Sequence, residues 1–246
     1  LYHLILSLIA FIFLRQPPRT KKPRTYRLSI WMQIIMVLRK PQCWFTCLYA
    51  LGMFSIVTTF CALWGLPFLV KMYGLSNEMA GIGISIVFIG LAMGCPIIGF
   101  MVNALGNVKK IMIVCSFASA VIMAIIIYPV VHYTDKWLYL LLFLLGLFGS
   151  GYFLSFEKMK HLVHESVQGI AMALCNMSAM AGALIFQPMI GFFLQIGIPK
   201  SQHHLHESYT SSEYQHAIIV MLLVLIMAFV VSFFIRTQNS LPNPEE

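Results

Sequence analysis

The side chains with the greatest capacity for metal or redox chemistry lie in two short stretches of this chain. Three histidines and a glutamate share one polar stretch: His203, His204, His206 and Glu207. Imidazole and carboxylate groups bind zinc or copper only when a fixed geometry brings them together. A polar loop does not fix that geometry, so we expect a solvated loop and no metal or other cofactor. Cys43 and Cys47, one helical turn apart, have no further ligands beside them and are expected to pack as small hydrophobes.

Catalytic groupings are missing from the apolar part of the sequence. Paired histidines within apolar segments, or a carboxylate cluster, would indicate a haem protein or a membrane enzyme, and the sequence has neither. No Asp, Glu, Lys or Arg lies near the middle of an apolar segment, where an ionisable group would be expected to carry protons. Glu157 comes nearest, but Lys158 and Lys160 beside it mark a segment end, and we expect an ion pair there. The chain is therefore predicted not to be an enzyme.

Two amide side chains do lie within one apolar segment. Asn176 and Gln187 are eleven residues apart, about three helical turns, so they project from nearly the same face of a helix. An amide is costly to bury without a hydrogen-bond partner. Each one therefore either bonds a neighbouring helix or faces a polar cavity, and the sequence leaves both alternatives open.

The composition places these side chains in a membrane. Of the 246 residues, 60% are hydrophobic and only 10% are charged, and the mean hydropathy is +0.85. Such a chain is too apolar for a water-soluble domain. Several apolar runs reach the ~20 residues that a helix needs to cross a bilayer. The net charge of +8 is gathered in connecting segments, where membrane orientation explains it better than nucleic-acid binding does.

The sequence predicts an all-α polytopic bundle embedded in the lipid bilayer, occupying residues 42–236. Six full-length spans are expected at 42–70, 78–104, 109–130, 136–157, 166–198 and 214–236. An apolar stretch at 1–14 is interpreted as the end of a transmembrane helix whose beginning is absent, with a signal-peptide segment as the alternative. A basic linker at 15–41 follows, and its second half is expected to form a short interfacial helix. Residues 237–246 form a polar tail.

The basic residues test the six spans. Cytoplasmic connections of membrane proteins carry an excess of Lys and Arg. With a cytoplasmic linker, thirteen of the sixteen Lys and Arg residues fall inside, eight of them in the linker. The remaining three, Lys71, Lys136 and Lys200, fall outside. Shifting any one span would move basic residues to the outside and weaken this asymmetry. The charges therefore support the assignment of the six spans.

The turn at residues 99–110, G-F-M-V-N-A-L-G-N-V-K-K, leads from the second full span into the third. Together with the six-span unit and the basic linker, this turn resembles the C-terminal half of a major facilitator superfamily transporter. In that family, twelve helices form two six-helix halves joined by a cytoplasmic loop. The family's turn pattern has Gly, three residues, Asp and Arg, then a central Gly and two basic residues. Gly99, Gly106, Lys109 and Lys110 match this conformational motif.

The sequence departs from the motif at two positions, with Asn103 in place of the Asp and Ala104 in place of the Arg. An Asp at a cytoplasmic helix end can pair with a basic group and the N-terminus of a neighbouring helix, which helps to latch one conformation. Asn keeps the hydrogen bonding but lacks the charge, so we expect a weaker latch. Two further stretches, 64–76 and 169–191, are similar to the seventh and eleventh helices of bacterial permeases for organic acids, sugar acids or amino acids.

The resemblance implies a secondary active transporter, in which two six-helix halves rock about a site at the middle of the membrane. In the family, the seventh, eighth, tenth and eleventh helices face that site. The residues expected to contact a small organic solute are Thr58, Thr59, Trp64, Tyr152, Asn176 and Gln187. Other polar positions on the same helices are Ser55, Ser85, Ser150 and Ser178. A hydroxyl can instead bond its own helix, which is the alternative role for each Ser and Thr.

Two other hypotheses stand beside a self-sufficient transporter. The chain could be a truncated remnant that inserts in the membrane without transporting. It could also be a half-size unit that needs a separate N-terminal half or a second copy of itself. In each case we expect a multi-pass protein of a cell membrane, the bacterial inner membrane in the first instance, with the linker and the C-terminus in the cytoplasm.

Overall fold

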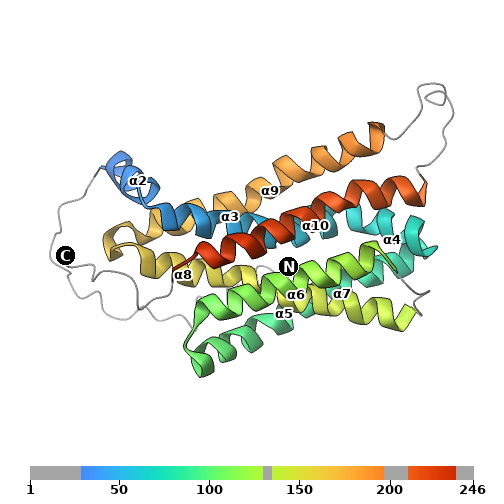
Figure 1. Cartoon of the computed structure of the whole chain (residues 1–246), viewed down its shortest axis with the longest axis horizontal. Helices are drawn as coiled ribbons and strands as arrows, with labels where there is room; N and C mark the ends of the chain where they lie inside the picture. The colour runs from blue at the N-terminus through green and yellow to red at the C-terminus, as the bar shows by residue number, and fades with distance from the viewer. Residues whose placement is uncertain (1–28, 130–134, 197–209, 237–246) are drawn as a thin grey trace, which may run out of the picture.

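Hydrocarbon offers a backbone polar group no partner except another protein group, so long apolar runs in a membrane fold as helices. The computed structural model describes residues 29–129, 135–196 and 210–236, and helices cover nearly all of them (Figure 1). No strand occurs within these ranges. The predicted all-α class is confirmed. The segment 1–14, the tail 237–246 and the histidine-containing stretch lie outside the described residues.

The helical elements follow one another in a simple order: α2 (Ile30–Leu38), α3 (Pro41–Ser55), η1 (Ile56–Trp64), α4 (Gly65–Tyr73), α5 (Asn77–Leu105), α6 (Val108–Ile127), α7 (Asp135–Gly149), η2 (Ser150–Phe153), α8 (Leu154–Leu162), η3 (Glu165–Val167), α9 (Gln168–Ile196) and α10 (Ser211–Phe234). Here η1 is a π-helix, whereas η2 and η3 are 3₁₀ turns.

Six continuous helical stretches are long and apolar enough to cross a membrane: Pro41–Tyr73, Asn77–Leu105, Val108–Ile127, Lys136–Leu162, Glu165–Gln195 and Ser211–Phe234. The six predicted spans are thereby confirmed. The fourth span is longer than expected, because it continues to Leu162 instead of ending at residue 157. Its last turns bury Met159 and Leu162, and α8 packs against α9 and α3.

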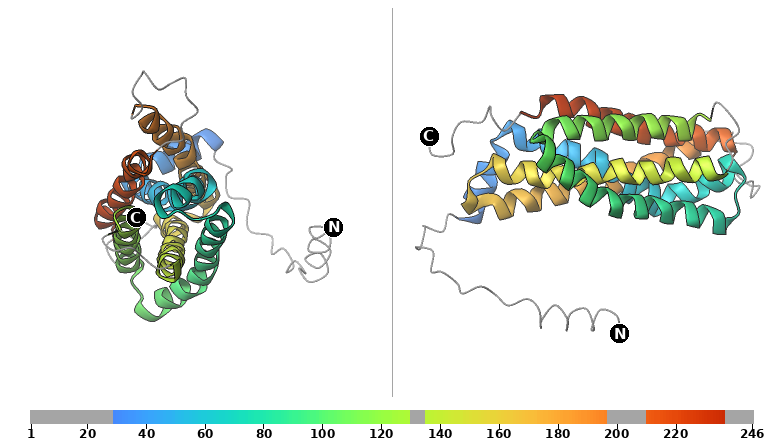
Figure 2. Two further views of the ribbon diagram at one scale, coloured as in Figure 1. Left: turned by 90° about the vertical axis from the view of Figure 1, so that its right-hand side faces the viewer. Right: turned by 90° about the horizontal axis from the view of Figure 1, so that it is seen from below.

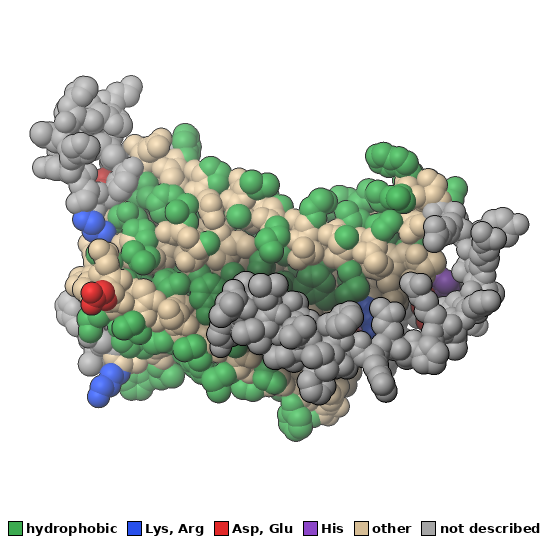
Figure 3. Space-filling view, turned by 180° about the vertical axis from the view of Figure 1, so that it is seen from behind, with side chains coloured by type: hydrophobic (Ala, Val, Ile, Leu, Met, Phe, Trp, Pro, Cys, Tyr) green, Lys and Arg blue, Asp and Glu red, His purple; other side chains and the backbone are tan. Residues whose placement is uncertain are grey.

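The six spans run side by side and alternate in direction along one long bundle (Figure 1). Viewed end-on, α9, α4 and α5 form one side of the bundle, while α10 and α6 form the opposite side (Figure 2). Hydrophobic side chains cover most of the described surface in Figure 3, and the charged side chains at its left-hand side stand at an end of the bundle. An apolar belt between polar ends is the surface that a bilayer requires.

The end of the bundle where α3 begins also holds the end of α10. Gln42 joins the two, because its Nε2 donates to the Phe234 carbonyl at 3.2 Å and its Oε1 accepts from the Arg236 amide at 2.8 Å. We call this the basic end, since it holds the following described residues: Arg39, Lys40, Lys109, Lys110, Lys158, Lys160 and Arg236. The opposite end holds Lys71 and Lys136.

Side chains from neighbouring helices close the C-terminal carbonyls at the basic end. A helix leaves its last four carbonyls without a partner inside the helix, and cations are favoured there by the helix dipole. Lys40 Nζ donates to the carbonyl of Leu162, the last residue of α8, at 2.9 Å. Lys109 Nζ donates to the Phe233 carbonyl of α10 at 2.7 Å. Each lysine thus joins two spans at the same time as it satisfies a helix end.

At the opposite end of the bundle, neutral side chains bond the last carbonyls of a helix. Tyr73 Oη donates to the carbonyl of Ile126 at 2.7 Å, and Gln215 Nε2 donates to that of Ile127 at 2.8 Å. Both acceptors belong to the last turn of α6. The spans are therefore joined at both ends by contacts between side chain and backbone.

Glycines let the backbones of α5 and α7 approach each other closely. A Cβ added at Gly90 would overlap the Phe143 carbonyl oxygen, and one at Gly146 would overlap that of Val87. Small residues allow membrane helices to approach at backbone distance. From the sequence, the small-residue pair Gly90 and Gly94, four residues apart, predicts a close-packing face, as does the pair Gly182 and Gly191. The structure confirms the face at Gly90. Gly182 and Gly191, for which similar packing was expected, have their nearest neighbours at 3.4 Å, an ordinary contact.

This packing predicts that Gly90→Ala destabilises the bundle by about 1–3 kcal/mol, because α5 and α7 must separate to admit the methyl group. Gly81→Ala, on the same helix, is the matched control, since a Cβ there meets no atom within 4 Å. Thermal unfolding in detergent, followed by circular dichroism, should show a lower Tm for Gly90→Ala and an unchanged or slightly higher Tm for Gly81→Ala. Equal Tm values for the two variants would contradict the close contact.

Candidate functional site

The first span changes its helical pitch at the predicted solute-binding threonines. Over Ile56–Trp64 the helix is of the π type, a rare form that occurs frequently at functional sites. Two hydroxyls compete with backbone amides for carbonyls at this transition: Ser55 Oγ donates to Gly52 O at 2.6 Å, and Thr58 Oγ1 donates to Phe54 O at 3.2 Å. Such bonds weaken the regular ladder and bend helices. The sequence run I-V-T-T therefore supplies a local reason for the irregular helix.

Gln187 of α9 is bonded to this π-helix at two points. Its Nε2 donates to the Thr58 carbonyl at 2.6 Å, and its backbone carbonyl accepts from Trp64 Nε1 at 3.1 Å. We call this pair of bonds the Gln187 clasp. Pro188 follows directly and removes one amide from the α9 ladder. The clasp therefore joins an irregular part of one span to a proline-weakened part of another.

The clasp brings together three of the six predicted solute-binding residues. A fourth predicted residue, Thr59, follows Thr58 in the sequence. Its side chain is fully buried, and its hydroxyl has no hydrogen-bond partner. Within the described residues, only Ser119 Oγ shares this condition among buried side-chain polar atoms. An unpaired buried hydroxyl costs about 1–3 kcal/mol. Thr59 therefore leaves unused hydrogen-bonding capacity inside the bundle.

The other two predicted residues lie away from the clasp. Tyr152, in η2, is buried in an aromatic cluster, with ring centroids 4.3 Å from Phe54 and 4.1 Å from Phe153. Asn176 is exposed on α9. The structure thus gives Tyr152 a packing role and leaves the amide of Asn176 open to the outside of the bundle.

The four predicted serines bond backbone carbonyls. Ser55, Ser85 and Ser150 each bond a carbonyl of the same chain segment three or four residues earlier: Gly52, Gly81 and Leu147 respectively. Ser178 Oγ instead donates across to the Cys47 carbonyl of α3 at 2.9 Å. These contacts match the alternative structural role of the hydroxyls.

The side of the bundle that carries Asn176 is unusually exposed. In the apolar stretch of the α5 span only 22% of the residues are buried, and in that of the α9 span 28% are. The corresponding fraction in the other four spans is 50–56%. Exposed apolar residues on α9 include Leu184, at 81% exposure, and Phe192, at 59%. In the end-on view of Figure 2, α4 lies between α9 and α5, so the three form one continuous side.

A cavity of about 330 Å³ opens between α5 and η2–α8 near the basic end. Its polar lining includes Asn103, Ser150 and Glu157. Glu157 is paired with His161 of the next helical turn, at 2.8 Å. Glu157 therefore bonds a histidine and neither neighbouring lysine, and this contact is the expected ion pair only when His161 is protonated. Asn103 lines the same cavity as this carboxylate, and an Asp in its place would add a second negative charge to the cavity.

The turn at 99–110 joins α5 to α6 through two capping residues. Gly106 has φ of +61°, a left-handed conformation that favours glycine, and ends α5. Asn107 then caps α6, because its Oδ1 accepts from the Lys110 amide at 3.1 Å. Sequence reasoning missed this cap, although Asn directly before an apolar run is a usual signal for one. Gly99 meets no neighbour within 4 Å of an added Cβ, so packing does not require glycine there.

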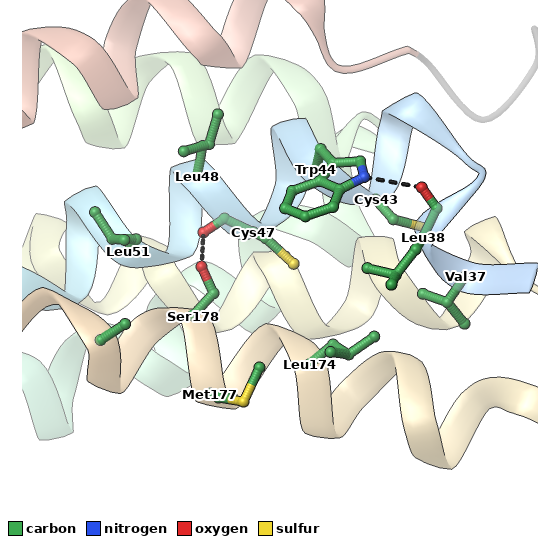
Figure 4. Close-up of a pocket in the computed structure, with 11 residues that line it drawn as sticks. Val37, Leu38, Cys43, Trp44, Cys47, Leu48, Leu51, Leu174, Met177 and Ser178 are labelled. Atoms are coloured by element: carbon green, nitrogen blue, oxygen red, sulfur yellow. Dashed lines mark hydrogen bonds between the residues drawn. The ribbon is translucent and has the colours of Figure 1, made fainter. Parts of the chain in front are cut away.

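A second cavity, an apolar groove of about 410 Å³, lies between α2, α3 and α9 (Figure 4). Cys43 and Cys47 line it as free thiols, together with Trp44, whose Nε1 donates to the Leu38 carbonyl at 2.9 Å. Ser178 is the polar side chain on the α9 wall, and it is occupied by its bond to Cys47 O. The groove offers apolar contact and little hydrogen bonding.

Comparisons with known proteins identify the family. The model of the Major Facilitator Superfamily matches residues 1–152 and residues 60–246. The chain belongs to the Major Facilitator Superfamily, whose members are transporters, and is a multi-pass membrane protein. No match occurs among the curated proteins.

The fold is similar to that of a solved transporter. The structure is that of a bacterial homolog to the human lysosomal transporter Spinster, in an inward-facing and unoccupied conformation. The TM-score is 0.56 with 14% sequence identity, and the match covers 94% of this chain and 56% of that one. The present chain thus spans little more than half of that structure, and the likeness concerns the fold alone.

The clasp predicts that Gln187→Met weakens the contact between α9 and η1. Loss of one hydrogen bond between membrane helices costs roughly 0.6–1.7 kcal/mol. Hydrogen exchange measured by mass spectrometry should show faster exchange of the backbone amides over 56–64 and a small fall in Tm. Gln195→Met removes the same side chain from an exposed position on the same helix and should change neither. Unchanged exchange at 56–64 in Gln187→Met would refute the clasp.

Proposed function

We propose that this chain acts as the C-terminal six-helix half of a secondary active transporter that moves a small organic solute by alternating access. The observation that carries the proposal is the uneven burial of the bundle. In a member of this transporter family, α5 and α9 expose most of their length along one side, and that side needs either a partner or a polar cavity. A second six-helix half would supply both.

The candidate residues take distinct roles in this proposal. Asn176 presents a free amide on the exposed side, which can donate to a carboxylate or hydroxyl of the solute. Thr59 supplies an unused hydroxyl deeper in the bundle. Gln187, with Thr58 and Trp64, holds the irregular η1 against α9. Tyr152 supports the wall by aromatic packing.

Two flexible points sit beside the clasp. The π-helix η1 and the proline-weakened turn of α9 are both places where a membrane helix can bend. Bending there would move the part of each span on one side of the clasp relative to the part on the other side. The clasp would keep the two spans in register with each other. This gives the exposed side a means of opening and closing.

The solute class is proposed as an organic acid, a sugar acid or an amino acid. The support is the similarity of the stretches 64–76 and 169–191 to permeases for such compounds, together with the hydrogen-bonding amides on α9. The basic end is proposed to face the cytoplasm of a cell membrane, because seven described Lys and Arg residues gather there and two at the other end. The linker and the C-terminus would then be cytoplasmic.

The second candidate function is a half-size unit that works only as a pair. The same exposed side supports it, because Leu184 and Phe192 offer an apolar surface to a second copy as well as to an N-terminal half. A remnant without transport activity would leave that side in contact with lipid alone. The bundle of six joined spans is compatible with each arrangement.

Uptake into liposomes tests the proposal. Purified chain is reconstituted alone, and together with a separately produced N-terminal six-helix half, and uptake of a labelled panel of organic acids, sugar acids and amino acids is measured. We expect accumulation of at least one compound class only in vesicles that contain two halves. The absence of uptake under every condition would count against the transporter and favour the remnant.

A pair of variants locates the solute site within the same assay. Asn176→Leu should lower uptake about tenfold or more, because one hydrogen bond to a charged solute contributes roughly 1.5–3 kcal/mol. Gln195→Leu, which removes an exposed amide near the end of α9, should leave uptake unchanged. Equal uptake by the two variants would remove Asn176 from the site.

A further inference from the structure

The apolar groove between α2, α3 and α9 begins at the basic end of the bundle. Leu38, the last residue of α2, and Trp44, in the first turn of α3, line it there. Leu51 of α3 lines it furthest from that end. Leu174 and Met177 extend from α9 into the space between α9 and α3 (Figure 4). The groove therefore leads from a polar end of the bundle towards the middle of the membrane.

The length and width of the groove suit a single extended chain. Its α3 wall, from Trp44 to Leu51, and its α9 wall, from Leu174 to Ala181, each rise about 10 Å at ~1.5 Å per residue. One leaflet of a ~30 Å hydrocarbon core is about 15 Å deep, so the groove follows most of one leaflet. A volume of about 410 Å³ over that length leaves a cross-section of about 40 Å², roughly half that of a helix about 10 Å in diameter. A helix of a neighbouring subunit does not fit into it.

The polar groups of the lining are already used. The Ser178 hydroxyl donates to the Cys47 carbonyl, and Trp44 Nε1 donates to the Leu38 carbonyl. An extended peptide in the groove would bury its backbone amides and carbonyls without partners, which is costly. A hydrocarbon chain has no such groups to satisfy. The lining therefore favours an acyl chain over a peptide segment.

The groove is open to the outside of the bundle. Trp44 and Met177 in its walls are 53% and 63% exposed. Its walls come from α2, α3 and α9, and neither α4 nor α5 contributes a residue. It therefore lies beside the side formed by α9, α4 and α5, which a second half would cover. In a membrane, lipid has access to this opening.

A cation stands at the beginning of the groove. Arg39 directly follows Leu38 and is exposed, and its guanidinium bonds no described residue. Lys40, in contrast, is occupied at the Leu162 carbonyl. Ile30 and Trp31 of α2 are also exposed, which suits a helix at the level of the lipid headgroups. A cation at that level attracts anionic lipids.

We propose that the groove binds one acyl chain of an anionic phospholipid whose phosphate lies at the level of Arg39. The chain fills the space between α3 and α9 below α2. The lipid thereby holds α2 against α9 at the basic end. This role is independent of the solute site, because none of the six predicted solute-binding residues lines the groove.

Native mass spectrometry of the full chain in detergent, titrated with phosphatidylglycerol, tests the groove. Ala181→Phe should raise the apparent Kd of the tightest lipid site about tenfold or more, because the ring takes the place of the acyl chain. Ala173→Phe is the matched control, since Ala173 is exposed on the same helix outside the lining, and it should leave the Kd within about twofold. Equal weakening by the two variants would overturn the site.

A charge variant tests the headgroup without changing the groove. Arg39→Gln should raise the Kd for phosphatidylglycerol about fivefold and leave that for phosphatidylcholine, which has no net charge, within about twofold. Lys160→Gln removes another exposed charge from the basic end and should change neither Kd. Equal Kd values of the unmodified chain for the two lipids would overturn the assignment to an anionic lipid.

A photoreactive lipid locates the acyl chain directly. Phosphatidylglycerol with a diazirine midway along one acyl chain is bound and irradiated, and the adducts are mapped by peptide mass spectrometry. We expect adducts within 43–51 and 174–181, and their loss in Ala181→Phe. Adducts confined to other segments would overturn the placement. Loss of a dimer of the chain in Ala181→Phe with unchanged lipid binding would instead make the groove an interface between copies, and would also overturn the proposal.

Discussion

The carbonyl groups at helix ends are the constraint on which this bundle depends. Each span leaves its last carbonyls without a partner in its own helix, and a bilayer supplies none. The structure meets this need for three of the six spans with side chains from elsewhere in the chain. Lys40 and Lys109 donate to the last turns of α8 and α10 at the basic end, and Tyr73 and Gln215 donate to the last turn of α6 at the other. Because each donor lies in or directly before a different span from its acceptor, these contacts also hold the spans concerned side by side. The alternating directions of the six spans place the donors where the acceptors are.

The helices pack at backbone distance in one region of the bundle and have irregular backbone hydrogen bonding in another. At Gly90 and Gly146 the backbones of α5 and α7 touch, and a single methyl group would separate them. Around the Gln187 clasp, η1 and the Pro188 turn of α9 have irregular ladders and rely on side-chain bonds for their position. A rigid pair of helices beside a pair that can bend suits the alternating access proposed above. The exposed side formed by α9, α4 and α5 includes members of both regions.

The sequence predicted the six spans and the close face at Gly90, because hydrophobic length and small-residue spacing are local properties. It placed the end of the fourth span too early, since Lys158 was taken as a boundary although it is buried and the helix continues for another turn. The sequence predicted which residues could form the candidate site, but it did not predict their hydrogen-bond partners. That Gln187 bonds Thr58 and Trp64 depends on two spans more than 120 residues apart, and no local pattern carries that information. The π-helix was missed for a related reason, because hydroxyls that bend a helix have the same sequence signature as hydroxyls that do not.

In the proposed arrangement, the side formed by α9, α4 and α5 faces protein, whereas the opposite side, formed by α6 and α10, faces lipid. A photoreactive benzophenone amino acid in place of Leu184 on α9, and separately in place of Phe117 on α6, tests this in membranes of the producing cell. The two side chains are 81% and 54% exposed in the structure. Irradiation should give a protein adduct from position 184, to a second half or a second copy of the chain, and only lipid adducts from position 117. Lipid adducts alone from both positions would contradict the account.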